Sequence, residues 1–212
     1  MPTVYTIGHS VRSIDAFLKL LNRFEINCVI DVRSVPFSQY APQYNIFELK
    51  NTLSSNGIEY LFMGNEFGAM QTNLRLYDSD GLLNFEKVMQ SEQFQTGVKR
   101  VKEKIEQGFN LVFMCMEKDP MDCHRSILVG RAFHEEKYHV LNIMENGYIQ
   151  SQEKLIKRLL KHYFSKSYQT TIFDYLDLEQ NQKEAELIRE VYRLRNKDIG
   201  YKLEENALLQ GW

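Results

Sequence analysis

Short apolar runs alternate with amphipathic segments along most of the chain. The five runs cover residues 3–8, 27–33, 58–63, 111–115 and 138–144. All but one are apolar enough to be covered on both faces, which is typical of parallel strands buried between helices. We therefore predict an α/β fold of three layers, in which a mostly parallel central sheet of about five strands carries helices on both faces.

The segments between these runs repeat apolar residues at helical spacing. The expected helices cover residues 14–21, 45–57, 85–107, 127–133 and 152–164. Ser13 is predicted to cap the first helix, and Asn45 with Glu48 to begin the second as a capping box. We expect a break in the third helix near Gly97, and a long loop at residues 64–81, which show no period.

Residues 1–164 are predicted to form one α/β domain, and residues 165–212 a C-terminal linker with a helical extension packed on that domain. The composition changes after Phe164, where residues 165–171 are typical of a linker. Residues 184–195 then place apolar side chains along one side of a charged helix.

Length and composition exclude several classes of protein. The chain has 212 residues, enough to bury a full core, and its net charge of −2 gives no global basic field. No apolar run is long enough for a membrane helix, and the N-terminus lacks the pattern of a signal peptide. Its three cysteines have no disulfide-framework spacing, which suits a reducing compartment. We therefore expect a cytoplasmic protein that does not bind membranes. The oligomeric state is left unassigned.

The apolar run at residues 111–115 ends abruptly in a loop rich in cysteine, acidic, histidine and arginine residues. Two other runs also end in polar residues. His9 and Ser10 follow the first run, and Asp31 and Arg33 end the second. Ligands of parallel sheets bind beyond the carboxyl ends of the strands, so we expect these three ends to form one site.

The turn at residues 119–126 is predicted to hold an anion. A strand-to-helix turn presents unpaired N–H groups and the positive end of a helix dipole. Arg125 adds a guanidinium fork, and we expect it to face Arg33, with His124 and Ser126 as further anion-binding residues. The alternative is a structural network in which the nearby acids neutralise both arginines.

Several residues at these strand ends are candidates for catalysis. His9 suits proton transfer or hydrogen bonding, and Asp31 or Glu117 suits orientation or base work. Cys123 lies near a helix start, where a thiolate is stabilised, and is a candidate nucleophile or redox group. For each of them the alternative is a structural role as a hydrogen-bond or ion-pair partner. The supporting candidates are Ser10, Ser38, Cys115 and Asp119.

A metal site is not expected. Cys115, Cys123 and His124 offer soft ligands, but their spacing fits no zinc pattern with paired cysteines. We therefore predict no structural zinc and assign no metal ligand. The acids of the same loops could hold magnesium with a phosphorylated ligand, which no residue pattern supports. The cofactor is left unassigned.

Polar motifs at separated positions occur in an order that resembles a known family. They are Thr6-Ile7-Gly8-His9-Ser10, Asp31-Val32-Arg33 with Pro36 and Ser38, Glu66-Phe67-Gly68, and a loop from Cys115 and Glu117 through Asp119-Pro120 to Cys123-His124-Arg125. From about residue 5 to residue 160 the chain resembles family 488 of the domains of unknown function. The resemblance implies a compact α/β domain with these characteristic polar residues, and it implies no activity.

The chain departs from that family pattern at two places. Gly68-Ala69 stands where the family usually has paired glycines, so this loop is expected to differ in shape. Asn142-Ile143 stands where the family's last strand tends to end in His-Ile. Asparagine can hydrogen-bond but cannot exchange protons at neutral pH, so an activity that needs this histidine would be absent.

These observations indicate an enzyme, or an enzyme-derived domain, that binds a small anionic ligand of phosphorylated or nucleotide-like character. The alternative is a non-catalytic module that binds nucleic acid or protein. Its basic face would comprise Lys154, Lys157, Arg158 and Lys161. An affinity for oligonucleotides that falls sharply with salt would favour the module.

The first prediction concerns the thiols. Cys28 lies within an apolar run and should be inaccessible in the native protein, whereas Cys123 should react faster than either other cysteine. Timed alkylation followed by mass spectrometry measures the three rates. Equal, slow modification of all three would remove Cys123 from the candidates for nucleophilic chemistry.

Overall fold

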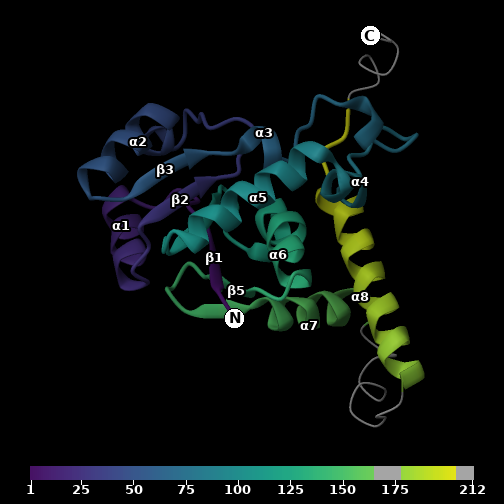
Figure 1. The fold of residues 1–212 in the computed structure, drawn as a ribbon. Coiled ribbons are helices and arrows are strands. Elements are labelled where there is room, and N and C mark those ends of the chain that lie inside the picture. Colours follow the sequence, from purple (N-terminus) through teal and green to yellow (C-terminus); the bar gives the residue numbers. More distant parts are fainter. Residues whose placement is uncertain (165–177, 204–212) are drawn as a thin grey trace.

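A computed structural model of the chain describes residues 1–164 and 178–203, and its centre is a six-stranded sheet of order β3-β2-β4-β1-β5-β6 (Figure 1). The strands are β1 (Thr3–Gly8), β2 (Cys28–Asp31), β3 (Glu59–Phe62), β4 (Leu111–Cys115), β5 (His139–Ile143) and β6 (Ile149–Ser151). All neighbouring strands run parallel except β5 and β6, which form an antiparallel pair. The predicted fold class is confirmed. The additional strand β6 is three residues long, too short to show a period in the sequence.

Helices cover both faces of the sheet, so the three layers are as predicted (Figure 1). One face carries α1 (Ile14–Arg23) and α2 (Ile46–Ser55). The other carries α3 (Gly64–Phe67), α4 (Phe85–Gln90), α5 (Glu92–Glu106), the π-helix η4 (Arg125–Gly130), α6 (Arg131–Glu135), α7 (Gln152–Tyr163) and α8 (Leu178–Ile199). Three 3₁₀ turns lie in the connections, η1 (Pro42–Tyr44), η2 (Leu74–Leu76) and η3 (Pro120–Asp122).

Strand β4 shows how alternate side chains feed two cores. Leu111 and Phe113 pack with the helices around α5, whereas Val112 and Met114 pack with α1 and α2. This is the two-residue period of a strand that is buried on both faces. It explains why the run at residues 111–115 is continuously apolar.

Two of the predicted local signals differ from the structure. Asn45 is the N-cap residue of α2, but its side chain accepts a hydrogen bond from the N–H of Ser38 and makes no capping bond. The helix expected over residues 85–107 breaks at Ser91, which caps α5 through its hydroxyl, and not at Gly97. Gly97 lies inside α5, where a Cβ atom would come within 2.9 Å of the Phe67 ring. Its small size therefore allows α5 to approach α3. Ser13 caps α1 as predicted.

The C-terminal helix α8 contains the segment predicted to be helical. Val191 and Tyr192 are buried in the core shared with α7, and Asn196 hydrogen-bonds the backbone at Leu83 and Phe85. The linker expected at residues 165–171 lies outside the described residues, so the division at residue 164 stays a prediction. Within residues 1–164 and 178–203, no helix has the length and apolar character to cross a membrane.

The chain leaves β1 and β4 on opposite faces of the sheet. The two strands are neighbours, but β1 leads into α1 on one face while β4 leads into η4 and α6 on the other. Open α/β sheets bind ligands beyond the strand ends at such a point, and the polar residues after β1 and β4 lie there.

Gly8 at the end of β1 permits the close approach of the loop after β4. A Cβ atom at this position would lie 1.8 Å from the carbonyl oxygen of Glu117. We expect Gly8→Ala to lower the free energy of unfolding by about 3 kcal/mol, the upper end of the usual cost of overpacking, because the obstacle is backbone. Urea denaturation measures this. Gly130→Ala is the control, since its nearest atoms would be 3.3 Å away or more, and an equal loss in both variants would contradict the prediction.

Candidate functional site

Three strand ends meet at the carboxyl edge of the sheet, as expected from the polar motifs. The backbone pairing continues past the strands. The N–H of His9 donates to the carbonyl of Cys115 over 2.9 Å, and the N–H of Val32 donates to the carbonyl of Met114 over 3.1 Å. The polar residues that follow β1, β2 and β4 are therefore held side by side.

Asp31, Arg33 and His9 form a closed hydrogen-bond network. Arg33 donates from Nε and Nη2 to the two carboxylate oxygens of Asp31, over 2.9 and 2.6 Å, and from Nη2 to the carbonyl of Tyr44 over 2.8 Å. The hydroxyl of Tyr60 donates to the same carboxylate over 2.8 Å. The carboxylate and guanidinium thus neutralise each other. This is the structural ion pair predicted from the sequence as the alternative to a ligand-binding role.

The contacts of His9 fix its tautomer. A guanidinium can only donate, so the Nη1 of Arg33 donates to His9 Nε2, 3.1 Å away, and His9 Nδ1 carries the proton that goes to the carbonyl of Ser10. Burial and the neighbouring charge of Arg33 lower the pKa of His9 to about 4. The ring is stacked on Tyr44 with 4.0 Å between centroids. At neutral pH His9 is therefore a neutral hydrogen-bonding group.

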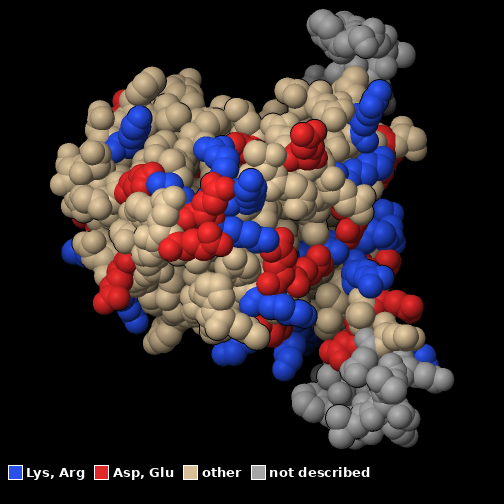
Figure 2. All heavy atoms as spheres, in the orientation of Figure 1, with Lys and Arg blue, Asp and Glu red and all other residues tan. Residues whose placement is uncertain are grey.

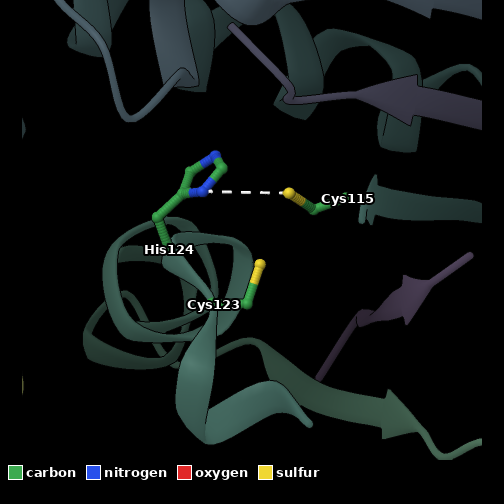
Figure 3. Close-up of side chains that lie close together, drawn as sticks. All are labelled: Cys115, Cys123 and His124. Carbon is green, nitrogen blue, oxygen red and sulfur yellow. Dashed lines mark hydrogen bonds between the residues drawn. The ribbon is translucent and has the colours of Figure 1, made fainter. Parts of the chain in front are cut away.

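Two cysteines and a histidine form a second polar cluster (Figure 3), and a glutamate contacts both thiols. Glu117 Oε2 lies 3.2 Å from Cys115 Sγ and 3.1 Å from Cys123 Sγ. His124 Nδ1 lies 3.8 Å from Cys115 Sγ. The two sulfur atoms and this nitrogen lie within 4.8 Å of one another. The spacing of these residues in the sequence fits no zinc pattern, but the fold brings their ligand atoms together.

Charges within this second cluster shift its pKa values in opposite directions. Burial disfavours a thiolate at Cys123, but hydrogen bonding from Cys115 and the charges of Arg125 and His124 bring the pKa of Cys123 well below its ordinary value. Hydrogen bonding to Cys123 and burial raise the pKa of Cys115. Burial, with the negative charge of Cys123, raises the pKa of Glu117. These shifts favour a negative charge on Cys123 over one on Cys115 or Glu117.

Arg125 is fully buried, and its guanidinium donates to backbone carbonyls. Its Nη1 donates to the carbonyl of Glu117 over 2.6 Å and its Nη2 to that of Lys118 over 3.4 Å, while Nε is buried without a partner among the described residues. The helix begins near Cys123 as predicted: Cys123 is extended, its carbonyl accepts the N–H of Ile127 over 3.1 Å, and the backbone is helical from His124. Both guanidinium forks are engaged within the chain, so Arg125 and Arg33 do not form an open clamp. Binding of an anion stays a prediction.

The remaining candidates have local structural partners. Ser126 donates to the side-chain oxygen of Asn142 over 2.7 Å, and Thr6 donates to the same oxygen over 2.8 Å. Ser38 accepts two backbone N–H groups within its own loop, and the carbonyl of Ser10 accepts the His9 proton. The fold thus uses Asn142 to pair two buried hydroxyls.

A cavity of about 520 Å³ opens next to the cysteine cluster. Residues 117–119, Asp122 and residues 144–146 line it. Three of its carboxylates are ion-paired, Asp119 with Arg158, Asp122 with Arg195 and Glu145 with Lys118. Glu117 lines the cavity and also contacts both thiols, so it connects the two.

Sequence reasoning missed three groups that shape the site. They are the hydroxyl of Tyr60, the ring of Tyr44 and the carbonyl of Val32, to which His124 Nε2 donates over 2.9 Å. Tyr60 lies in β3 and Tyr44 in a 3₁₀ turn, and neither position carries a local signal for a site. Only the pairing of strands places them here.

Comparison with known proteins gives one family. The family described as "Domain of unknown function DUF488" matches residues 13–132. The matched range contains the β2 and β4 ends of the site, while His9 and Asn142 lie outside it. No curated protein and no solved structure matches the chain.

The depressed pKa of His9 makes stability depend on pH in a defined direction. The pKa of His9 is 6.5 in the unfolded chain and about 4 in the native chain. Between these two values the unfolded chain binds a proton at His9 and the native chain does not. Stability is therefore complete above pH 6.5 and falls as the pH drops, by roughly 3 kcal/mol in all at about 1.4 kcal/mol per pKa unit. Urea denaturation between pH 7 and pH 4 should show a shallower decline in His9→Asn than in wild type. His162→Asn, at an exposed position, should follow wild type, and identical slopes in all three would contradict the assignment.

Proposed function

The chain belongs to the DUF488 family, and we propose that its carboxyl edge is an enzyme-type site for a small anionic ligand, in which Glu117 meets that ligand. The observation that carries this proposal is the position of Glu117. Glu117 lines a cavity of about 520 Å³, and its carboxyl contacts both Cys115 and Cys123. Clefts of this size suit small molecules, and a carboxyl between cleft and thiols can exchange protons with a bound ligand.

The charge of the cavity wall is nearly balanced. Three of its carboxylates are paired with cations, Asp119 with Arg158, Asp122 with Arg195 and Glu145 with Lys118. Lys118 is well exposed, so its amine is free to leave Glu145 at little cost. Lys118 is the cation that lines the cavity, and we infer that it, and not the buried Arg33 or Arg125, meets an anionic ligand.

The alternative function, binding of nucleic acid through α7, has less support. Arg158 of the proposed basic face is engaged with Asp119 and Gln150. Figure 2 shows positive and negative side chains interspersed on the face in view, without a single basic field. Non-specific nucleic-acid binding depends on such a field.

Lys118→Gln tests this contact. Inorganic phosphate and adenosine monophosphate are the probes, and the shift in melting temperature with increasing probe gives the affinity. We expect binding to wild type that is at least roughly tenfold weaker in Lys118→Gln, the loss of one charge-assisted hydrogen bond of about 1.5–3 kcal/mol. Glu117→Gln should also change the affinity.

Lys154→Gln on α7 is the matched control, because the same side chain is removed from an exposed position outside the cavity. It should bind both probes as wild type does. Absence of any shift in wild type, or equal loss in both lysine variants, would contradict the proposed site. Salt-dependent oligonucleotide binding that only Lys154→Gln weakens would support the alternative module.

A further inference from the structure

Cys115, Cys123 and His124 converge on one small volume. Figure 3 shows both sulfur atoms and the imidazole turned toward the same space, and these ligand atoms lie within 4.8 Å of one another. The three residues are at most 8% exposed. Cys115 is the last residue of β4, which buries it at the centre of the sheet edge. The backbone turns between the extended Cys123 and the helical His124, so adjacent residues can both reach this strand end.

The imidazole of His124 is oriented by its other nitrogen. Nε2 lies 2.9 Å from the carbonyl oxygen of Val32, which can only accept, so Nε2 carries a hydrogen. Nδ1 is thereby directed at the two sulfurs. Histidine ligands of metal ions almost always donate their second N–H to a carbonyl or carboxylate in this way. This contact is independent of the distances within the cluster.

The distances fit a tetrahedral ion with sulfur and nitrogen ligands. Such a zinc site, with Zn–S of about 2.3 Å and Zn–N of about 2.0 Å, separates sulfur from nitrogen by roughly 3.5 Å. The distance from Cys115 Sγ to His124 Nδ1 is 3.8 Å, so closure requires a shift of a few tenths of an ångström. Thiolate and imidazole ligands select zinc-class transition metals over magnesium or calcium.

The buried charges also suit a divalent ion. A dication and the two cysteine thiolates are neutral together. The ion would thus supply the counter-charge that buried thiolates require in low-dielectric surroundings. Arg125 is paired with backbone carbonyls and with no carboxylate in the described part of the chain.

We propose that Cys115, Cys123 and His124 bind one divalent metal ion of the zinc class, with Glu117 at the fourth coordination position. Glu117 Oε2 is already within 3.2 Å of both sulfurs. Because Glu117 also lines the cavity, a ligand or water there can take its place on the ion. Three protein ligands with an exchangeable fourth are the arrangement of catalytic zinc. In this respect the inference rests on the proposed function, since the ion would supply a positive charge for an anionic ligand.

Metal titration of the reduced, chelator-treated full chain tests the site. Wild type should bind one equivalent of Zn²⁺, counted by elemental analysis after dialysis. Co²⁺ should give thiolate-to-cobalt charge-transfer absorption, which reports sulfur ligation directly. Cys115→Ser, Cys123→Ser and His124→Asn should each weaken Co²⁺ binding at least roughly 100-fold, beyond the loss typical of an outer hydrogen-bond partner. Cys28→Ala removes the remaining cysteine, which lies outside the cluster, and should bind as wild type does.

A measurement on wild type alone covers the case in which a ligand variant fails to fold. Stoichiometric Zn²⁺ should slow alkylation of Cys115 and Cys123 at least roughly tenfold and leave Cys28 unaffected. No bound zinc, cobalt without charge-transfer bands, or unchanged alkylation would overturn the proposal. A disulfide between Cys115 and Cys123 that forms in preference to metal binding would overturn it too.

These outcomes are separate from those of the proposed function. Zinc and cobalt binding are measured without any anionic ligand, while phosphate and adenosine monophosphate are titrated both with chelator and with zinc. If the chain binds metal but no anion, the metal-site proposal stands and the proposed function is wrong. If anions bind equally well with chelator and with zinc, the anion site stands and the metal ion plays no part in it.

Discussion

The buried guanidinium of Arg125 is the interaction on which the site depends. It ties the carbonyls of Glu117 and Lys118 to the start of η4, so the loop after β4 folds back on itself. Gly8 makes room for that loop, because any larger residue would strike the Glu117 carbonyl. Strand β1, the loop and the π-helix are therefore held in one arrangement. Cys115 lies at one end of this loop and Cys123 at the other, which is why their sulfurs meet.

A fully buried arginine without a carboxylate partner is costly, and its charge must be balanced by what the fold places nearby. Backbone carbonyls satisfy two of its nitrogens, and the negative charge next to them lies on Cys123, whose pKa is held well below the ordinary value. The way the loop is anchored thus favours a thiolate at Cys123. The proposed metal site would use this thiolate as a soft, negatively charged ligand.

The sequence predicts the layers of this fold well, because alternation of apolar runs with helical periods is a local property that burial enforces. It also locates the site, since three polar strand ends must meet at the same edge of a parallel sheet. It fails where a partner is distant in the chain. Asn45 was expected to cap its own helix but pairs with Ser38, and Arg33 was expected to face a ligand but is taken by Asp31. The meeting of Cys115 with His124 depends on the turn at Cys123, for which no spacing rule exists.

The two polar clusters at this edge differ in how completely their hydrogen-bonding groups are paired. In the first, Asp31, Arg33 and His9 saturate one another, so this cluster is a rigid support with no group to offer a ligand. Val32 lies between Asp31 and Arg33, and its N–H donates to the carbonyl of Met114. Its carbonyl then orients His124, the residue that turns an imidazole nitrogen toward the sulfurs. In the second cluster, two thiols, an imidazole and a carboxyl face one another, and their hydrogen bonds depend on how few protons are shared among them. The saturated network is therefore the frame, and the second cluster is the part of this edge that the proposed metal site uses.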